Sequence, residues 1–162
     1  MRLFALLRTV IVASFFVWLW CFLIPRLFRI PLHVVHREAW SVIAIGGLIA
    51  AACMFEFAWR GLGTPAPMDP PRHLVVSGTY RFVRNPMYVG FAIALLGEAW
   101  LTARIEIVYE TLFYLAFFTL FVMAYEEPAL RAKFGDDYRE YCRNVGRWIP
   151  RLTPWYSRRH LE

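Results

Sequence analysis

The sequence predicts an all-α protein, a polytopic bundle of membrane helices with about four or five spans. Of its 162 residues, 59% are hydrophobic and 18% aromatic, which is more apolar than one small core inside a polar surface requires. The apolar residues gather in four stretches, three of which approach the roughly 20 residues that a helix needs to cross a bilayer. No β-α-β pattern occurs in the chain. We therefore expect the excess apolar surface to face lipid.

The expected spans follow from the boundaries of the apolar stretches. They are Leu3–Ile24, Ala39–Trp59, Met87–Leu101 and Ile105–Tyr125. The third is short, so it is expected to tilt or to begin inside the preceding loop. The first resembles a secretory signal because Arg2 precedes an apolar run, but its length, its late tryptophans (Trp18 and Trp20) and the lack of a small-residue cleavage site favour a retained helix.

The chain divides into an N-terminal transmembrane hairpin, residues 1–59, and a second half, residues 60–162. Small residues in the second span indicate close helix packing; they are Gly46, Gly47, Ala50, Ala51 and Ala52. Glu56, near the end of this span, is expected to reach water or an arginine. The glycines and prolines between residues 60 and 71 exclude a regular element, so the 60–76 loop is expected to be ordered or lid-like.

An amphipathic segment follows the fourth span. Apolar and aromatic residues recur there at helical spacing among charges, namely Leu130, Phe134, Tyr138, Tyr141 and Val145. Gly135 is expected to break this run into two pieces. The pattern predicts C-terminal helices that lie along the membrane surface and pack against the bundle.

Basic residues are distributed unevenly about the expected spans. Of the 18 basic residues, 14 fall at the N-terminus, in the 60–86 segment or after the fourth span, and the net charge is +6. The positive-inside rule puts that side, with both termini, in the cytoplasm, as in a bacterial inner (plasma) membrane. Such a surface favours membrane lipids as partners over nucleic acid. The three cysteines form no C-x-x-C pattern, so neither a metal site nor a disulfide is expected.

Polar groups cluster where the third span is expected to begin. Pro86 suits a first helical turn and Asn85 before it suits an N-cap. The free N–H groups of that turn can hold an adenine edge or a carboxylate. Arg81 and Arg84, three residues apart, can serve one anion together.

A pair of acids closes the fourth span. Glu126 and Glu127 repel each other and lose hydration at a membrane boundary, so a cationic partner is expected. Either an arginine from the same face or the ammonium group of a ligand would serve.

Together, two segments resemble a known signature. V-S-G-T-Y-R-F-V-R-N-P-M-Y-V-G, which ends at Gly90, and E-E-P-A-L-R-A-K-F-G-D-D-Y-R-E-Y, which begins at Glu126, are similar to the isoprenylcysteine carboxyl methyltransferase and phospholipid methyltransferase families. The resemblance covers roughly residues 72–150, about half of the chain.

The resemblance implies a membrane methyltransferase whose second half is catalytic. It implies a pocket for S-adenosylmethionine under the C-terminal helix, and a lipophilic or prenylated acceptor that enters sideways from the bilayer. The implied cofactor-binding residues are Tyr80, Arg81, Arg84, Asn85, Pro86, Tyr88, Glu126 and Glu127. One departure is that the prenylcysteine enzymes carry an arginine shortly before the paired glutamates, where this chain has the apolar run 120–123.

Catalytic roles are expected for Glu98, Arg84 and Tyr88. A carboxylate acceptor needs no general base, whereas an amine or hydroxyl acceptor must lose a proton to Glu98, His73, Glu126 or Tyr88. Glu98 stands out because an acid inside a span is costly, although an interfacial glutamate beside Trp100 is an equal reading.

Three function classes remain open from the sequence. The first is a methyltransferase acting on a prenylcysteine carboxylate, or alternatively on a phospholipid or other amine. The second is an NADPH-dependent membrane reductase related to the sterol reductases. The third is a non-catalytic membrane subunit whose arginines serve topology alone.

Overall fold

The computed structural model describes residues 7, 10–11, 14–56 and 73–156. Within these ranges the regular structure is helical, and no strand occurs among them. The elements in chain order are η1 (Leu19–Leu23), α2 (Ile24–Leu27), η2 (Arg37–Ala39), α3 (Trp40–Glu56), η4 (Gly78–Arg81), α4 (Pro86–Thr102), α5 (Ile105–Phe121), η5 (Val122–Glu126) and α6 (Glu127–Asn144). The all-α prediction is therefore confirmed.

Two helices are long and apolar enough to cross a membrane. They cover Arg37–Glu56 and Ile105–Asn144, and two shorter apolar helices cover Ser14–Leu27 and Pro86–Thr102. The long helices are not core helices of a water-soluble domain, because large apolar side chains on them are exposed, with Leu48 at 70% and Leu120 at 68%. Lipid is the environment that such a surface requires. The count of four or five spans stays a prediction.

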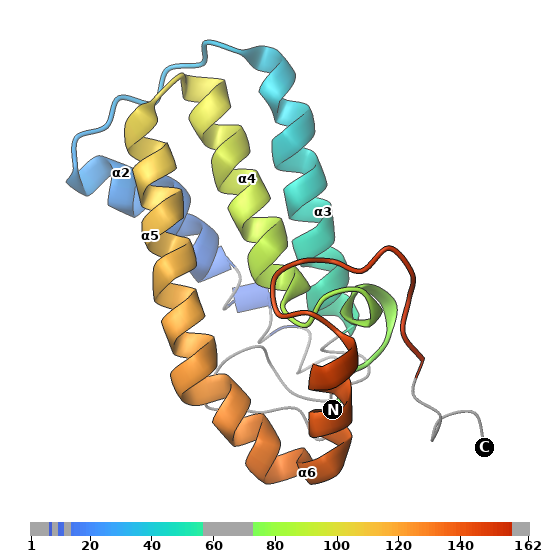
Figure 1. The fold of residues 1–162 in the computed structure, drawn as a ribbon. Coiled ribbons are helices and arrows are strands. Elements are labelled where there is room, and N and C mark those ends of the chain that lie inside the picture. The colour runs from blue at the N-terminus through green and yellow to red at the C-terminus, as the bar shows by residue number, and fades with distance from the viewer. Residues whose placement is uncertain (1–6, 8–9, 12–13, 57–72, 157–162) are drawn as a thin grey trace.

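Helices α3, α4 and α5 run side by side (Figure 1). The backbones of α3 and α4 come very close at Gly46, where a Cβ would lie 2.5 Å from the carbonyl oxygen of Gly90. Ala50, one turn along, is buried on the same face, whereas a Cβ at Gly47 would meet open space. The prediction that small residues serve helix packing is thus confirmed for one face of the stretch.

An aromatic core joins the N-terminal helix to α4 and α5. Trp20 lies edge-on against Tyr114, with ring centroids 5.0 Å apart, and both are buried with Tyr88, Leu95 and Phe118. This core fixes the position of α4 relative to α5.

The end of α3 is fastened to the segment that precedes α4. The Ser77 hydroxyl donates a hydrogen bond to the Glu56 carboxylate. The described partner of Glu56 is therefore this hydroxyl, and the expectation that Glu56 also reaches water or an arginine stays a prediction. Residues 57–72, which include most of the expected lid-like loop, lie outside the described residues.

The chain turns back on itself after α5. Helix α5 continues through the π-helical turn η5 into α6, which bends at Gly135, where φ is 53° and ψ is −123°. The predicted break at this glycine is confirmed, since few other residues adopt a positive φ. Beyond the bend, Tyr138, Tyr141 and Val145 are buried, and the C-terminal segment passes close to the ends of α3 and α4 (Figure 1).

Candidate functional site

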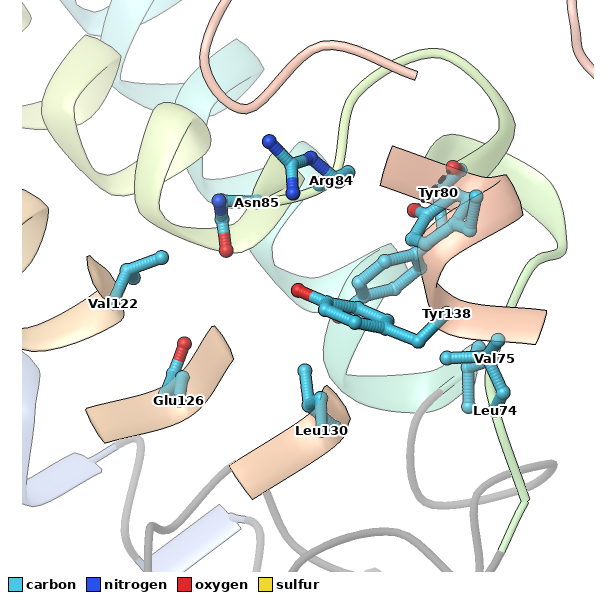
Figure 2. A pocket seen from close by; sticks show the side chains of 10 residues that line it. Leu74, Val75, Tyr80, Arg84, Asn85, Val122, Glu126, Leu130 and Tyr138 are labelled. Carbon is cyan, nitrogen blue, oxygen red and sulfur yellow. Dashed lines mark hydrogen bonds between the residues drawn. The ribbon is translucent and has the colours of Figure 1, made fainter. Parts of the chain in front are cut away.

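A cavity of about 50 Å³ opens where the start of α4, the turn η5 and helix α6 converge. Figure 2 shows side chains from these elements around it. The ten lining residues are Leu74, Val75, Tyr80, Arg84, Asn85, Val122, Glu126, Leu130, Tyr138 and Tyr141. The walls are thus largely aromatic and aliphatic, with a few polar groups, as is typical of a small-molecule site.

Asn85 and Arg84 form one side of the cavity, immediately before α4 (Figure 2). Asn85 occupies the N-cap position, but its side chain makes no capping hydrogen bond. Its amide instead donates to the carbonyl oxygen of Arg147, with Nδ2 and O 3.1 Å apart. The predicted N-cap position of Asn85 is therefore confirmed, although its side chain bonds the returning C-terminal segment and does not cap the helix.

Glu126 lies across the cavity from Asn85 (Figure 2). It accepts a hydrogen bond from the Tyr88 hydroxyl, which lies 2.7 Å from Oε1. The ring of Tyr88 is buried against Phe118, with centroids 4.7 Å apart. Packing in the core therefore holds the hydroxyl that orients the carboxylate.

Glu127 points away from this cavity into a group of arginines. Its carboxylate is 2.6 Å from Arg147 Nε, 3.1 Å from Arg84 Nη1 and 3.3 Å from Arg131 Nη2. Burial raises the pKa of Glu127, but the hydrogen bond from Arg147 and the positive charges of the arginines outweigh it, and the net pKa lies below 4.5. The expected cationic partner is thus an arginine for Glu127, whereas the described partner of Glu126 is a hydroxyl.

Two aromatic residues of α6 complete the cavity and were absent from the predicted site. Tyr138 and Tyr141 line it, and the Tyr141 hydroxyl donates to the carbonyl oxygen of Tyr80 at 2.7 Å. Burial and the neighbouring Tyr138 raise the pKa of Tyr141, which keeps it a neutral donor. The sequence signal that could have identified these two tyrosines was their spacing of three residues on the apolar face of an amphipathic helix. The predicted site also omitted Arg147, which contacts Glu127.

The other predicted residues lie around or away from the cavity. Pro86 is buried in the first turn of α4, and the Arg81 guanidinium stacks 4.3 Å above the Tyr156 ring; neither lines the cavity. His73 is exposed. Glu98 lies ten residues beyond Tyr88 on α4, about 15 Å along the helix, so the structure does not bring it to the cavity.

The cavity residues fit a zwitterionic cofactor with an aromatic base. Arg84 Nε is buried and has no hydrogen-bond partner in the part of the chain that the structure describes. A buried unpaired donor is costly, so a ligand carboxylate would satisfy it. Glu126 supplies the opposite charge from the facing side of the cavity (Figure 2). No group of three or more metal-ligating side chains occurs among the described residues.

The chain is similar to proteins of one family. The model of the phospholipid methyltransferase family matches residues 37–137. "Protein-S-isoprenylcysteine O-methyltransferase" of Schizosaccharomyces pombe is 39% identical over 120 residues, which cover 72% of this chain and 50% of that protein. "Methanethiol S-methyltransferase" of Pseudomonas deceptionensis is 27% identical over 146 residues, which cover 83% of this chain and 53% of that protein.

The share of each chain that these matches cover determines which conclusions they support. The chain spans about half the length of these two curated relatives. No solved structure matches it. The family model covers more than half of the chain, including Asn85, Tyr88, Glu126 and Glu127. The chain therefore belongs to the phospholipid methyltransferase family.

Proposed function

We propose that the protein is a membrane methyltransferase that takes its methyl group from S-adenosylmethionine and transfers it to a lipophilic acceptor. The observation that carries the proposal is the cavity at the end of the apolar helices, where Glu126 and Arg84 offer opposite charges on walls of tyrosine and leucine. Family membership and the names of the relatives support the same reaction class.

The polar groups of the cavity are suited to the amino-acid end of the cofactor. Glu126, whose described hydrogen-bond partner is a neutral hydroxyl, would take the ammonium group. Arg84 would offer its unpaired Nε to the carboxylate. Tyr80 and Tyr138 provide aromatic surface for the adenine, and Asn85 also lines the cavity.

In the proposed reaction the bound sulfonium supplies an electrophilic methyl group. The bond from sulfur to the methyl carbon breaks as the acceptor atom bonds that carbon in line. The electron pair of the broken bond stays on sulfur, which becomes a neutral thioether. Because the sulfonium charge is dispersed or neutralised and no new charge is created, alignment and exclusion of water should supply most of the acceleration. The buried aromatic packing around Tyr88 would serve both purposes.

The proposal also concerns the chemical class of the molecule that accepts the methyl group. A prenylcysteine carboxylate, as in the name of the S. pombe relative, needs a cation beside it. Arg84, the basic residue that lines the cavity, already contacts Glu127 and Cys142, and the apolar run 120–123 supplies no other. Glu126 would also repel a carboxylate.

A neutral thiol or amine suits this charge pattern better. A thiol, as in the name of the P. deceptionensis relative, becomes a strong nucleophile once it loses its proton. Its proton would go to Glu126 or to water, and its sulfur would take the methyl group. An amine would lose its proton to Glu126 or to water. We propose a neutral acceptor that enters from the bilayer, with the cavity facing the cytoplasm of a bacterial inner membrane.

The first experiment is calorimetric titration of the detergent-purified protein with S-adenosylhomocysteine. Saturable binding is expected, with the Kd raised about tenfold or more in Glu126→Gln, because an ion pair to the ligand is lost. Glu98→Gln is the matched control, since it makes the same change on α4 far from the cavity. A folded protein that binds NADPH instead would point to the reductase, and one that binds neither would point to a non-catalytic subunit.

The second experiment identifies the acceptor. Transfer of labelled methyl from S-adenosylmethionine is measured with a farnesylcysteine, an alkanethiol and phosphatidylethanolamine. Product from the thiol or the amine, without product from the farnesylcysteine, is the expected result. A clear preference for the farnesylcysteine would overturn the proposal of a neutral acceptor and leave the methyltransferase assignment intact.

A further inference from the structure

We infer that Arg147 is a positioning residue. It latches the C-terminal segment to α6 and thereby orients the polar side chains of the cavity so that they can bind the methyl donor. We call residues 145–155 the C-terminal strap. The inference rests on the proposed function for the ligand used in its test, but the latch itself rests on contacts within this chain.

The latch is a two-pronged ion pair. Arg147 places Nε 2.6 Å from Oε1 of Glu127 and Nη2 3.0 Å from Oε2. The Glu127 side chain is only 5% exposed and the Arg147 side chain 28%, so this pair is partly shielded from solvent and salt. A fork of this kind fixes the direction of the arginine as well as its distance. The strap is thus tied to the first turn of α6.

Backbone hydrogen bonds align the strap with the segment before α4. The amide of Arg84 donates to the carbonyl of Gly146, and the amide of Arg151 donates to the carbonyl of Phe82, both at 2.9 Å. The amide of Trp155 donates to the carbonyl of Arg81 at 3.1 Å. These bonds cross between segments more than 60 residues apart in the sequence, and Arg147 lies among them.

The latched strap reaches the cavity through two contacts. The carbonyl oxygen of Arg147 accepts the Asn85 amide hydrogen bond, which holds that side chain at the cavity wall. The next residue, Trp148, places its ring 6.3 Å from the ring of Tyr88. Tyr88 in turn donates to Glu126. Release of Arg147 would therefore loosen both Asn85 and the tyrosine that orients the cavity carboxylate.

Arg131 provides a matched comparison on the same carboxylate. It lies 3.3 Å from Glu127, but it belongs to α6 itself, four residues along, and its side chain is 56% exposed. An exposed pair within one helix contributes little. Loss of Arg131 removes one positive charge from Glu127 without releasing the strap.

The test combines two measurements on the detergent-purified full chain. The variants are Arg147→Ala, Arg147→Lys and Arg131→Ala. Titration with S-adenosylhomocysteine gives the Kd, and hydrogen exchange of peptides covering residues 145–155 reports whether the strap is held. We expect Arg147→Ala to raise the Kd at least tenfold and to speed exchange of the strap. Arg131→Ala should change the Kd less than twofold, and Arg147→Lys should recover part of the loss because it keeps the charge but not the fork.

The outcomes separate the latch, its consequence for binding and the proposed function. Faster strap exchange in Arg147→Ala with an unchanged Kd would overturn the positioning role. Equal effects of Arg147→Ala and Arg131→Ala would show that only charge matters, which also overturns it. If the wild-type protein does not bind S-adenosylhomocysteine, the proposed function and the positioning role both fail, while unchanged strap exchange in Arg147→Ala is the result that removes the latch itself.

Discussion

The close approach of α3 and α4 allows a sharp test of how the bundle positions its site. Gly46 and Gly47 are neighbours on α3, and each can be changed to alanine. A Cβ at position 46 would lie 2.5 Å from the carbonyl oxygen of Gly90 and 2.6 Å from the amide nitrogen of Ala94, both backbone atoms. A Cβ at position 47 would have no atom within 4 Å among the described residues.

The size of the effect follows from that geometry. Ordinary van der Waals contact begins at 3.4 Å, so the two helices would have to separate by about 1 Å at this point. Overpacking of this kind costs roughly 1–3 kcal/mol, against a gain of up to about 1 kcal/mol from replacing glycine in a helix. Gly46→Ala should therefore destabilise the protein by about 1–2 kcal/mol, whereas Gly47→Ala should be neutral or stabilising.

Thermal unfolding in detergent measures both variants under one condition. For a chain of this size we expect Gly46→Ala to lower the melting temperature by roughly 2–8 °C and Gly47→Ala to leave it unchanged or slightly raised. Because α4 carries Tyr88 and follows Asn85, Gly46→Ala should also weaken S-adenosylhomocysteine binding. Indistinguishable melting temperatures for the two variants would refute the close backbone contact.

Three further predictions concern the site and α6. Tyr88→Phe removes the hydroxyl that donates to Glu126, so the Kd for S-adenosylhomocysteine should rise roughly tenfold in calorimetry. An unchanged Kd would show that the hydrogen bond between Tyr88 and Glu126 does not contribute to binding. Gly135→Ala forces a side chain onto a backbone with φ of 53° and should lower the stability by about 1–2 kcal/mol in thermal unfolding; an equal melting temperature would argue against the bend. The pKa of Glu127 is held below 4.5, so its ion pairs contribute stability above that pH and lose it as the pH falls through the folded pKa. The melting temperature of the wild-type protein should accordingly fall more steeply below pH 4.5 than that of Glu127→Gln, and parallel curves would contradict the ion pairs.

The sequence alone was informative wherever the signal was local. Hydropathy located the apolar helices, since the predicted Ile105–Tyr125 and Met87–Leu101 differ little from the ends of α5 and α4. Pro86 marked a helix start and Gly135 marked a bend, because each residue restricts or frees the backbone at its own position. The motif resemblance led to the family that the comparisons then established.

The sequence could not predict which polar residues pair with one another. Adjacent Glu126 and Glu127 look equivalent in the chain, yet the helix turns one into the cavity and the other into three arginines. Nothing in the spacing of Asn85 and Arg147, 62 residues apart, shows that they share a hydrogen bond.

Composition and periodicity thus determined which segments of this protein become helices, because helix formation here depends on local backbone preference and on transfer from water. The family came from the two sequence motifs. Only the tertiary structure decided which carboxylate faces the cavity and which residue holds the C-terminal strap. Such pairings depend on how the chain folds back on itself. In this protein that return is set by the η5 turn, the bend at Gly135 and the packing of Tyr138 and Tyr141.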